Sequence, residues 1–395
     1  CLARSQYVKI PITRTSLTLQ ERQSVLGPLE SGWLVQGPKV REFEEKWTTF
    51  IGTRYSVAVT SCTSALHLSL AALDFGPGDE AIVPAFTWIS TANVVEHLGG
   101  KVVFCDINLE TFNLDVDQIE SKITERTKAI LPVHLFGLSA DMDPIVELAR
   151  KHNLGIVEDA ACGFGSKYKG SHVGTIGDTG CFSFHPRKAI TTGEGGMVTT
   201  NNPDLAQRIT RLRDHGAEIS DLQRHLGPRP YLLADHPDAG YNQRMTDLQG
   251  ALGAAQMERA LEIVDERRTL ARRYDEAFDS LTWLGTPFVE DGYEHGYQSY
   301  PCLFEPEEIS QRSISRIHEL RNSLMDQLQA DGVSTRPATH AVHMLSYYKE
   351  KYQIEPQDFP NARAADQCSI SLPLFHGMKK CEQDFVVEKV FETEF

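Results

Sequence analysis

The sequence is poor in the features that mark metal-binding, disulfide-bonded and membrane proteins. Its eight cysteines form no Cys-x-x-Cys pair and do not cluster with histidine, so we expect neither a metal site nor a disulfide framework. No apolar run reaches the roughly 18 residues that a membrane-spanning helix needs. Positive charge is scarce too: a formal net charge of -15 argues against nucleic acid or an anionic membrane as partner. A reducing, cytoplasmic setting fits best.

Short motifs of several common enzyme classes are missing as well. The sequence contains no HExxH, no GxxxxGK[ST], no GxGxxG after a strand and no GxSxG. These absences argue against zinc hydrolases, P-loop and dinucleotide-binding proteins, and serine hydrolases. The chemistry must therefore come from other residues.

The order of apolar segments predicts the fold class. From residue 55 onward, β-prone apolar runs alternate with helical stretches, which indicates an α/β fold with a mostly parallel sheet between layers of helices. The 395 residues favour two domains: an N-terminal arm and a large α/β domain over 1–250, then a linking helix and a small α+β domain over 251–395. We expect helices over residues 18–29 and, opened by a capping box of Thr246 and Gln249, over about 246–278.

Lys188 is the residue around which the chemistry is predicted. It follows a β-prone segment, 180–185, and precedes a glycine-rich turn, 193–196, that leads into a second extended segment. Lysine forms a Schiff base with an aldehyde cofactor, and a partly enclosed site makes its amine a usable nucleophile. The alternative is an ordinary loop lysine paired with a carboxylate.

Asp159 is the second candidate. It ends the apolar segment LGIVED, and ligand-binding residues of open α/β sheets lie at the carboxyl ends of strands. A pyridoxal phosphate (PLP) enzyme needs a carboxylate against the pyridine nitrogen, because the protonated ring is then an electron sink. The alternative is a helix N-cap.

Several further residues fit the same cofactor. Thr63 and Ser64 lie at a strand-to-helix turn, where hydroxyls and free helix amides bind phosphate, and Ser183 adds another hydroxyl. Trp88 follows another strand, where its indole either stacks on a ring or belongs to the core. His185, beside the lysine, is either a polar wall of the site or a satisfied core histidine.

These segments together resemble the DegT/DnrJ/EryC1/StrS sugar aminotransferases, a branch of the fold-type I PLP enzymes. The matching segments run in family order across residues 35–275 and include GPGDEAIVP, FTWISTANVV, ILPVHLFG, VEDAA, GDTGCFSFHPRKAITTGEGGMVTT and GYNQRMTDLQGALGAAQ. The resemblance implies the PLP-dependent transferase fold of type I. The arm and the C-terminal part match more loosely.

The resemblance also implies roles for individual residues. Lys188 would form the Schiff base with PLP, and Asp159 would contact the pyridine nitrogen. Trp88 would stack on the ring. The phosphate would be held by Thr63, Ser64 and Ser183 and, from the other subunit, by Asn242, which makes the family a homodimer with shared active sites.

Two departures from the family pattern are both cysteines. The family usually has Gln after VEDAA, near the phenolic oxygen of the cofactor, whereas this sequence has Cys162. The family often reads Asn-Gly before Thr-Ser, whereas this sequence has Ser61 and Cys62. A lysine at position 188 argues against the dehydratase branch of the family, which carries histidine there.

The predicted function, which the resemblance implies, is transfer of an amino group from L-glutamate, the family's usual donor, to a keto group of a nucleotide-linked deoxysugar. Residues 217–240, His340 and His343 are expected to influence the choice of substrate. Two alternatives stay open: a PLP-dependent sugar dehydratase or other lyase, and a regulatory protein that keeps the fold without turnover.

Overall fold

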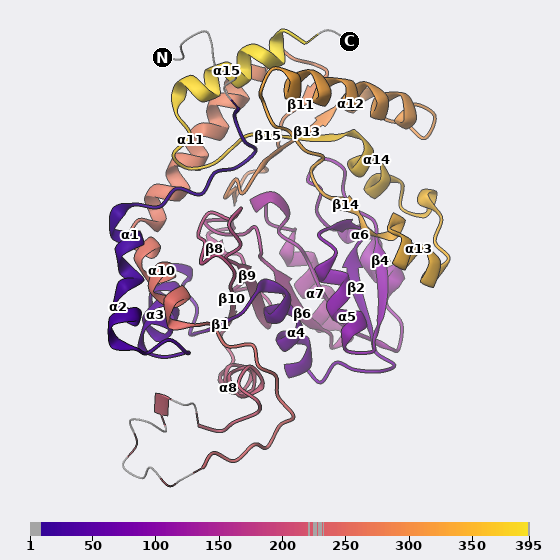
Figure 1. Cartoon of the computed structure of the whole chain (residues 1–395). Helices are drawn as coiled ribbons and strands as arrows, with labels where there is room; N and C mark the ends of the chain where they lie inside the picture. Colours follow the sequence, from indigo (N-terminus) through magenta and orange to yellow (C-terminus); the bar gives the residue numbers. More distant parts are fainter. Residues whose placement is uncertain (1–8, 220–221, 224–226, 228–230, 232, 394–395) are drawn as a thin grey trace.

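The computed structural model of the chain describes residues 9–219, 222–223, 227, 231 and 233–393. The chain folds around one large sheet, which carries the candidate site, and a smaller sheet built from later residues (Figure 1). Within the described residues, no helix combines the length and the apolar character needed to cross a lipid bilayer.

The large sheet has seven strands in the order β1-β10-β9-β6-β5-β2-β4. Strand β10 is antiparallel to both of its neighbours, and every other neighbouring pair is parallel. The predicted α/β fold with a mostly parallel sheet is therefore confirmed. The strands are β1 (Tyr55–Val59), β10 (Gly196–Thr200), β9 (Thr179–Ser183), β6 (Gly155–Asp159), β5 (Thr127–Ile130), β2 (Glu80–Pro84) and β4 (Lys101–Cys105).

Helices cover both faces of this sheet because consecutive strand residues point to opposite sides. In β1, Val57 and Val59 join the core beneath α4, α5 and α8, whereas Ala58 between them packs with α3 and α10. The covering helices are α3 (Pro38–Ile51), α4 (Cys62–Ala72), α5 (Ser90–His97), α6 (Val116–Lys122), α7 (Met142–His152), α8 (Pro203–Leu212) and α10 (Asp247–Met257).

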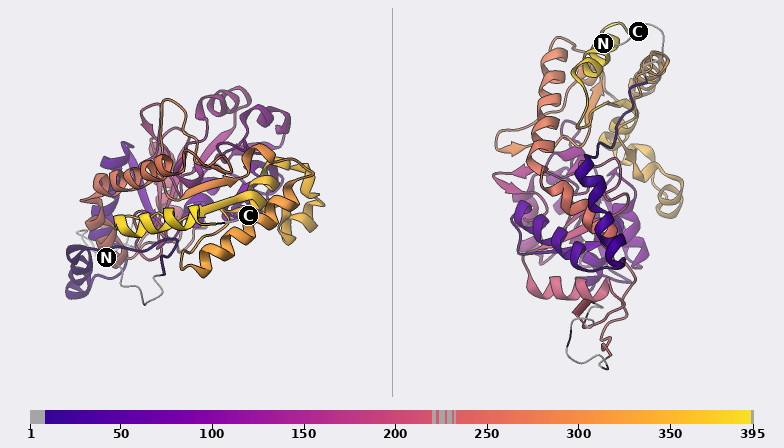
Figure 2. Two further views of the ribbon diagram at one scale, coloured as in Figure 1. Left: turned by 90° about the horizontal axis from the view of Figure 1, so that it is seen from above. Right: turned by 60° about the vertical axis from the view of Figure 1, so that its left-hand side comes forward.

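The smaller sheet has the strand order β11-β13-β15 and is antiparallel. Apolar side chains of four helices form one buried cluster with it. Seen from above, the yellow C-terminal helix α15 lies beside the salmon helix α11 (Figure 2). The elements are β11 (Leu284–Gly285), β13 (Tyr300–Phe304), β15 (Ser369–Leu372), α11 (Ala260–Phe278), α12 (Ile314–Ala330), α14 (Pro360–Cys368) and α15 (Lys380–Phe391).

One segment from each side of the predicted boundary at residue 250 packs on the other side of it. Ile10 is buried in the core of the smaller sheet and donates its N–H to the carbonyl of Gly332 at 2.7 Å. In the other direction, β14 (His340–Ala341) pairs with β3 (Phe86–Thr87), and α13 (Ser346–Tyr352) places Tyr348 in the core of the large sheet. A third sheet joins β12 (Tyr293–Glu294), β7 (Lys167–Tyr168) and β8 (Ser171–His172). The division at residue 250 stays a prediction.

Two predicted helices are each broken into two. The first consists of α1 (Leu19–Ser24) and α2 (Leu26–Ser31), so the prediction of one helix over 18–29 is wrong. The capping box of Thr246 and Gln249 is confirmed, but α10 ends before Arg259, whose φ and ψ of -119° and 26° are not helical. The Arg259 guanidinium bonds Glu21 of α1 at 2.6 Å, a contact that no local pattern in the sequence reveals.

Candidate active site

Several of the predicted site residues lie at one edge of the large sheet. Asp159 is the last residue of β6 and Ser183 the last residue of β9, its parallel neighbour. In the register, Gly196 of β10 lies between Ser183 and the last residue of β1. Helix α4, with Thr63 and Ser64 in its first turn, begins directly after β1. The fold therefore brings together segments that are more than a hundred residues apart in the sequence.

Asp159 is buried at this edge and accepts hydrogen bonds on both oxygens. The hydroxyl of Thr91, in α5, donates to Oδ2 at 2.7 Å, and the N–H of Ala161 donates to Oδ1 at 3.1 Å. Burial raises the pKa of Asp159, and these bonds together with the charge of Lys188 oppose that rise. A carboxylate has about four lone-pair sites, so Asp159 still has room for one more donor.

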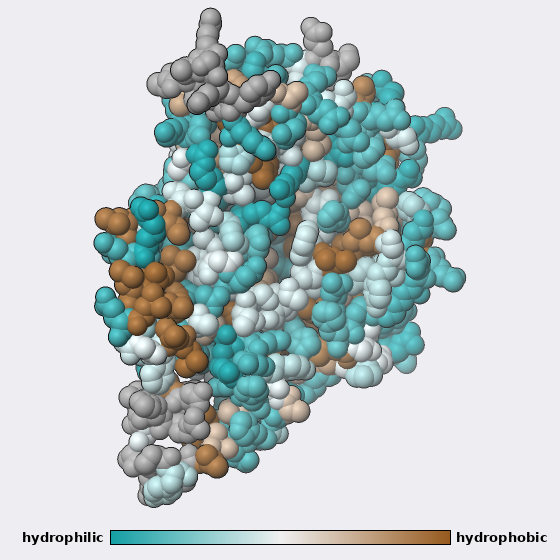
Figure 3. Space-filling model, viewed as in Figure 1, coloured by the Kyte–Doolittle hydropathy of each residue, from teal (hydrophilic) through white to brown (hydrophobic). Residues whose placement is uncertain are grey.

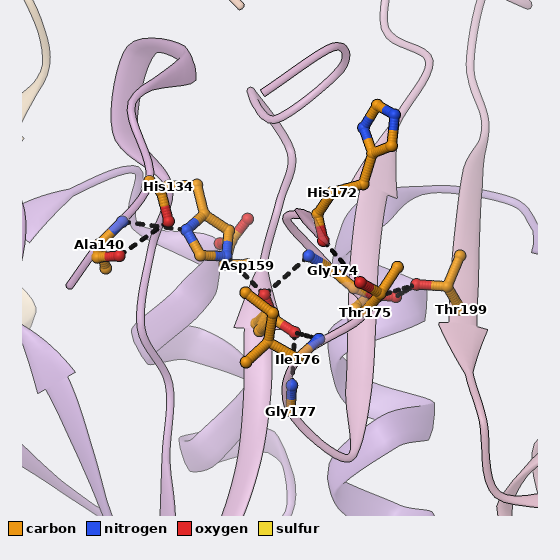
Figure 4. Close-up of polar contacts among 12 residues, drawn as sticks. His134, Ala140, Asp159, His172, Gly174, Thr175, Ile176, Gly177 and Thr199 are labelled. Carbon is orange, nitrogen blue, oxygen red and sulfur yellow. Dashed lines mark hydrogen bonds and ion pairs between the residues drawn. The ribbon is translucent and has the colours of Figure 1, made fainter. Parts of the chain in front are cut away.

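The neighbouring Glu158 is buried, and it faces the opposite side of β6 from Asp159 because consecutive strand residues alternate. Its hydrogen-bond partners His134, Gly174, Ile176 and Gly177 are labelled in Figure 4. The N–H of Ala140 donates to Nδ1 of His134 at 3.1 Å, which leaves the proton on Nε2 to donate to Glu158 at 2.8 Å. Glu158 also accepts the N–H groups of Gly174 (2.7 Å), Ile176 (2.8 Å) and Gly177 (2.6 Å). This carboxylate holds the loop before β9 against β6.

Lys188 lies in the loop between β9 and β10, and its side chain reaches back toward the end of β6. Its Nζ is 3.0 Å from Sγ of Cys162, and the side chain is half-buried. A distant residue stabilises the turn just before Lys188, because the side-chain amide of Gln298 donates to the carbonyl of Arg187 at 2.8 Å. Nδ1 of His185 accepts the Arg187 N–H at 3.2 Å, so this ring nitrogen closes its own turn. Burial, with the charge of Arg187, lowers the pKa of His185.

The first turn of α4 offers polar groups to the same edge. Ser61 caps the helix by accepting the N–H of Ser64 at 3.0 Å, and the Ser64 hydroxyl lies 2.9 Å from that of Thr60. The other amides of this turn remain available, as at any helix N-terminus. A Cβ at Gly196 would lie 2.4 Å from the carbonyl carbon of Ser61, so only glycine allows the turn to approach β10 so closely.

Trp88 and Asn242 are both open to solvent in the single chain. Trp88 precedes α5 and is 54% exposed, so the alternative of a core tryptophan is wrong. Its ring lies 5.9 Å, centroid to centroid, from that of His340, which β14 places beside β3. Asn242 is exposed near the end of β1, where Arg244 is bridged to Val59 and Asn242 to Asp214.

The residues expected to choose the substrate have different surroundings. His340 is exposed beside Trp88, as a substrate contact requires. His343 is buried against Phe359, and burial lowers its pKa, so it offers no surface to a bound molecule in the single chain. Its influence on the choice of substrate stays a prediction. Nine residues of the 217–240 segment lie outside the described residues.

Two contacts at the site were missed by the sequence reasoning. Thr91 stands 68 residues before Asp159, and its signal was only a Ser-Thr pair at the start of a helix. The bond between His134 and Glu158 had a clearer signal, because Glu158 is a charged residue inside an apolar strand segment. Buried charges require partners.

A mostly parallel α/β sheet whose carboxyl edge holds a lysine amine and a buried carboxylate fits the PLP-dependent fold of type I that the resemblance implies. The chain belongs to the DegT/DnrJ/EryC1/StrS aminotransferase family, whose sequence model matches residues 16–391. The resemblance drawn from the sequence is thus confirmed. The chain is a PLP-dependent sugar aminotransferase.

Similar proteins match along nearly their whole length. The chain is 38% identical over 382 residues to the spore coat polysaccharide biosynthesis protein SpsC of Bacillus subtilis, covering 96% of each chain. It is 37% identical over 384 residues to the GDP-perosamine synthase of Escherichia coli O157:H7, covering 97% of this chain and 98% of the relative. Among solved structures, the PMP form of the putative sugar aminotransferase Spr1654 of Streptococcus pneumoniae has a TM-score of 0.88 at 30% identity, covering 96% of this chain and 98% of that one.

The residues at the sheet edge fit PLP. The cofactor has an aldehyde, a pyridine nitrogen and a phosphate, and each matches the chemistry of a group on this edge. The amine of Lys188 matches the aldehyde, the Asp159 carboxylate with its free lone pairs matches the nitrogen, and the amides and hydroxyls of the first α4 turn match the phosphate.

Proposed function

We propose that this enzyme moves an amino group from L-glutamate to a keto group of a nucleotide-linked deoxysugar. The observation that carries the proposal is the Lys188 amine turned toward the end of β6, where Asp159 is buried. The likeness to a GDP-perosamine synthase supports a nucleotide-linked sugar as the acceptor. The likeness to SpsC supports a place in amino-sugar synthesis for a surface polysaccharide.

In this proposal, Lys188 and Asp159 carry the chemistry. PLP, when bound, would supply an electron sink for negative charge on the reacting carbon. Lys188 would hold the cofactor through its amine, and the same amine would move a proton to or from the substrate carbon. Asp159 keeps a proton on the ring nitrogen. When the keto sugar accepts the amino group, the same two residues would serve again, with the Lys188 amine moving the proton in the opposite direction.

The other residues bind and orient. Thr63, Ser64 and Ser183 hold the phosphate dianion at the start of α4, where the helix dipole favours negative charge. Trp88 covers one face of the ring. His185 forms part of the site wall.

We further propose a homodimer in the cytoplasm, with active sites shared between subunits. Apolar side chains gather on α1 and α2 and just after them, at the left of Figure 3, including Leu26, Leu29, Leu34 and Val35. Leu29 is 55% exposed, and patches of this kind mark protein interfaces. Asn242 is exposed in the single chain and contacts the phosphate of the partner's site in this proposal. The half-buried thiol of Cys162 fits a reducing compartment.

The first experiment follows the absorption spectrum of the purified protein with PLP, before and after L-glutamate, in wild type, Lys188→Ala and Lys349→Ala. Lys349 is an exposed lysine of α13 and serves as the matched control. We expect the band of lysine-bound cofactor in wild type and Lys349→Ala, and its conversion by glutamate with release of 2-oxoglutarate. Lys188→Ala lacks the band and loses transfer by about 10²–10⁴-fold.

Other outcomes point elsewhere. A wild-type protein without the band contradicts the role of Lys188. A band that glutamate leaves unchanged overturns glutamate as the donor. Consumption of a keto sugar without 2-oxoglutarate indicates a dehydratase or lyase, and binding of PLP without any turnover indicates the regulatory alternative.

The shared site has a separate test. When Lys188→Ala and Asn242→Asp chains are co-expressed, half of the dimers are mixed, and each mixed dimer has one site with both residues intact if the site is shared. We expect recovery of about a quarter of wild-type activity in the mixture, although each variant alone is impaired. Mixed dimers as inactive as the parents mean that both residues serve the same chain's site.

A further inference from the structure

Both cysteines that depart from the family pattern lie against a catalytic group. Sγ of Cys162 is 3.0 Å from Nζ of Lys188, and Sγ of Cys62 is 4.0 Å from Oδ1 of Asp159. Cys62 is otherwise engaged, because its thiol donates to the carbonyl of Cys181 at 3.4 Å. Cys162 is the one of the two that contacts the lysine amine.

The position of Cys162 is determined by the turn that follows β6. The N–H of Ala161 bonds the Asp159 carboxylate at 3.1 Å, and the N–H of Gly163 bonds the carbonyl of Ala160 at 2.8 Å. A Cβ at Gly163 would lie 2.5 Å from Val173, so this turn is packed tightly against the neighbouring loop. The same turn therefore links the Asp159 carboxylate to the sulfur atom that faces Lys188.

A lysine side chain has several rotatable bonds and about 2 kcal/mol of rotamer entropy to lose when it is held in one geometry. Its amine must nevertheless return to one place in each half of the proposed reaction, first to move a proton and then to bond the cofactor again. A hydrogen-bond acceptor on a rigid turn shortens that search, because it restricts the freed amine to positions near the reacting carbon.

Resting on the function proposed above, we infer that Cys162 is a positioning residue: its sulfur accepts a hydrogen bond from the freed amine of Lys188 and holds it at the cofactor. No covalent bond to sulfur is involved.

The test compares Cys162→Ala, Cys162→Ser and Cys381→Ala with wild type. Cys381 is a half-buried free cysteine of α15, outside the site, and controls for loss of a thiol. Two rates are measured by rapid-mixing absorption: capture of added PLP by the cofactor-free protein, and the loss of the lysine-bound band with glutamate. The circular dichroism spectrum and melting temperature of each variant establish that it is folded.

We expect Cys162→Ala to slow both rates about tenfold, because the amine loses the hydrogen bond that holds it at the cofactor. Serine keeps an acceptor on the same turn, so Cys162→Ser stays within about threefold of wild type, and Cys381→Ala is unchanged. Folded Cys162→Ala protein that captures PLP as fast as wild type overturns the inference. A Cys162→Ser variant as slow as Cys162→Ala also overturns it, because side-chain volume then decides the rate.

The capture of PLP needs no amino donor, which separates this inference from the proposed function. If wild type captures PLP but glutamate leaves the band unchanged, the proposed donor fails while the capture rates still decide the role of Cys162. If wild type captures no PLP, both fail together.

Discussion

Glu158 and Asp159 are adjacent in the sequence, share strand β6 and are both buried carboxylates, yet their surroundings differ. Glu158 accepts from His134 and from three backbone N–H groups, so its hydrogen-bonding capacity is filled. Asp159 accepts from Thr91 and Ala161, keeps lone pairs for another donor, and has a pKa raised by burial. Adjacent strand residues face opposite sides of a sheet. The end of β6 can therefore place a structural carboxylate on one face and a binding carboxylate on the other.

The difference teaches how a binding group is told from a structural one. A buried charge that is fully bonded stabilises the fold, whereas a buried charge with unfilled capacity carries a cost in the free chain that a cofactor offsets. On this view, changes at Asp159 affect activity first, and changes at Glu158 affect stability first.

The largest effect is expected for Asp159→Asn. Asparagine keeps the size of the side chain but has no charge to hold the proton on the ring nitrogen, so we expect kcat/KM to fall about 10²–10³-fold. The melting temperature of the cofactor-free protein should change little. Steady-state kinetics and thermal unfolding measure the two quantities. A variant with activity within threefold of wild type contradicts the assignment of Asp159 as the binding carboxylate.

Glu158→Gln should show the opposite pattern. The amide nitrogen of glutamine accepts no hydrogen bond, so two of the four donors around position 158 lose their buried acceptor. We expect the free energy of unfolding to fall by about 2–5 kcal/mol, measured by urea denaturation. Protein that remains folded should still bind PLP. An unchanged unfolding midpoint would show that the filled carboxylate does not stabilise the fold.

Thr91→Val tests whether the hydrogen bond from Thr91 supports cofactor binding by Asp159. The substitution removes the donor at 2.7 Å, so the carboxylate loses one stabilising bond to its charged form. We expect PLP to dissociate with a constant about tenfold higher, measured by equilibrium dialysis. Thr49→Val is the control, because Thr49 bonds only a helix carbonyl at 3.0 Å on the exposed face of α3. Equal affinity in the two variants contradicts this assignment.

The smallest effect concerns pH. Because burial raises the pKa of Asp159 in the folded chain, this group's contribution to stability is present at pH below its unfolded pKa and is lost as pH rises through the folded one. Asparagine does not titrate. The stability of cofactor-free Asp159→Asn relative to wild type should therefore increase as pH rises above the ordinary aspartate pKa of about 4. Urea denaturation across that range measures it, and a constant difference contradicts the raised pKa.

Local sequence patterns were enough for some features. The segment before Asp159 is an apolar strand that ends in a charge, so Asp159 could be placed at a strand end. The glycine-rich turn after Lys188 leads into a second strand, so Lys188 could be placed in the loop between two strands. The capping box of Thr246 and Gln249 was likewise recognisable from four residues. The residues that contact Asp159 and Lys188 could not be recognised in this way, because the strand order β1-β10-β9-β6-β5-β2-β4 does not follow the sequence.

By itself, then, the sequence determined the α/β class, because hydrophobic periodicity is a local property. Its resemblance to one family determined the cofactor and predicted which lysine and which carboxylate react. Only the tertiary structure decided that Thr91 serves Asp159, that Cys162 faces Lys188, and that Arg259 bonds Glu21. These contacts depend on where distant segments come to lie, and packing of the whole chain determines that.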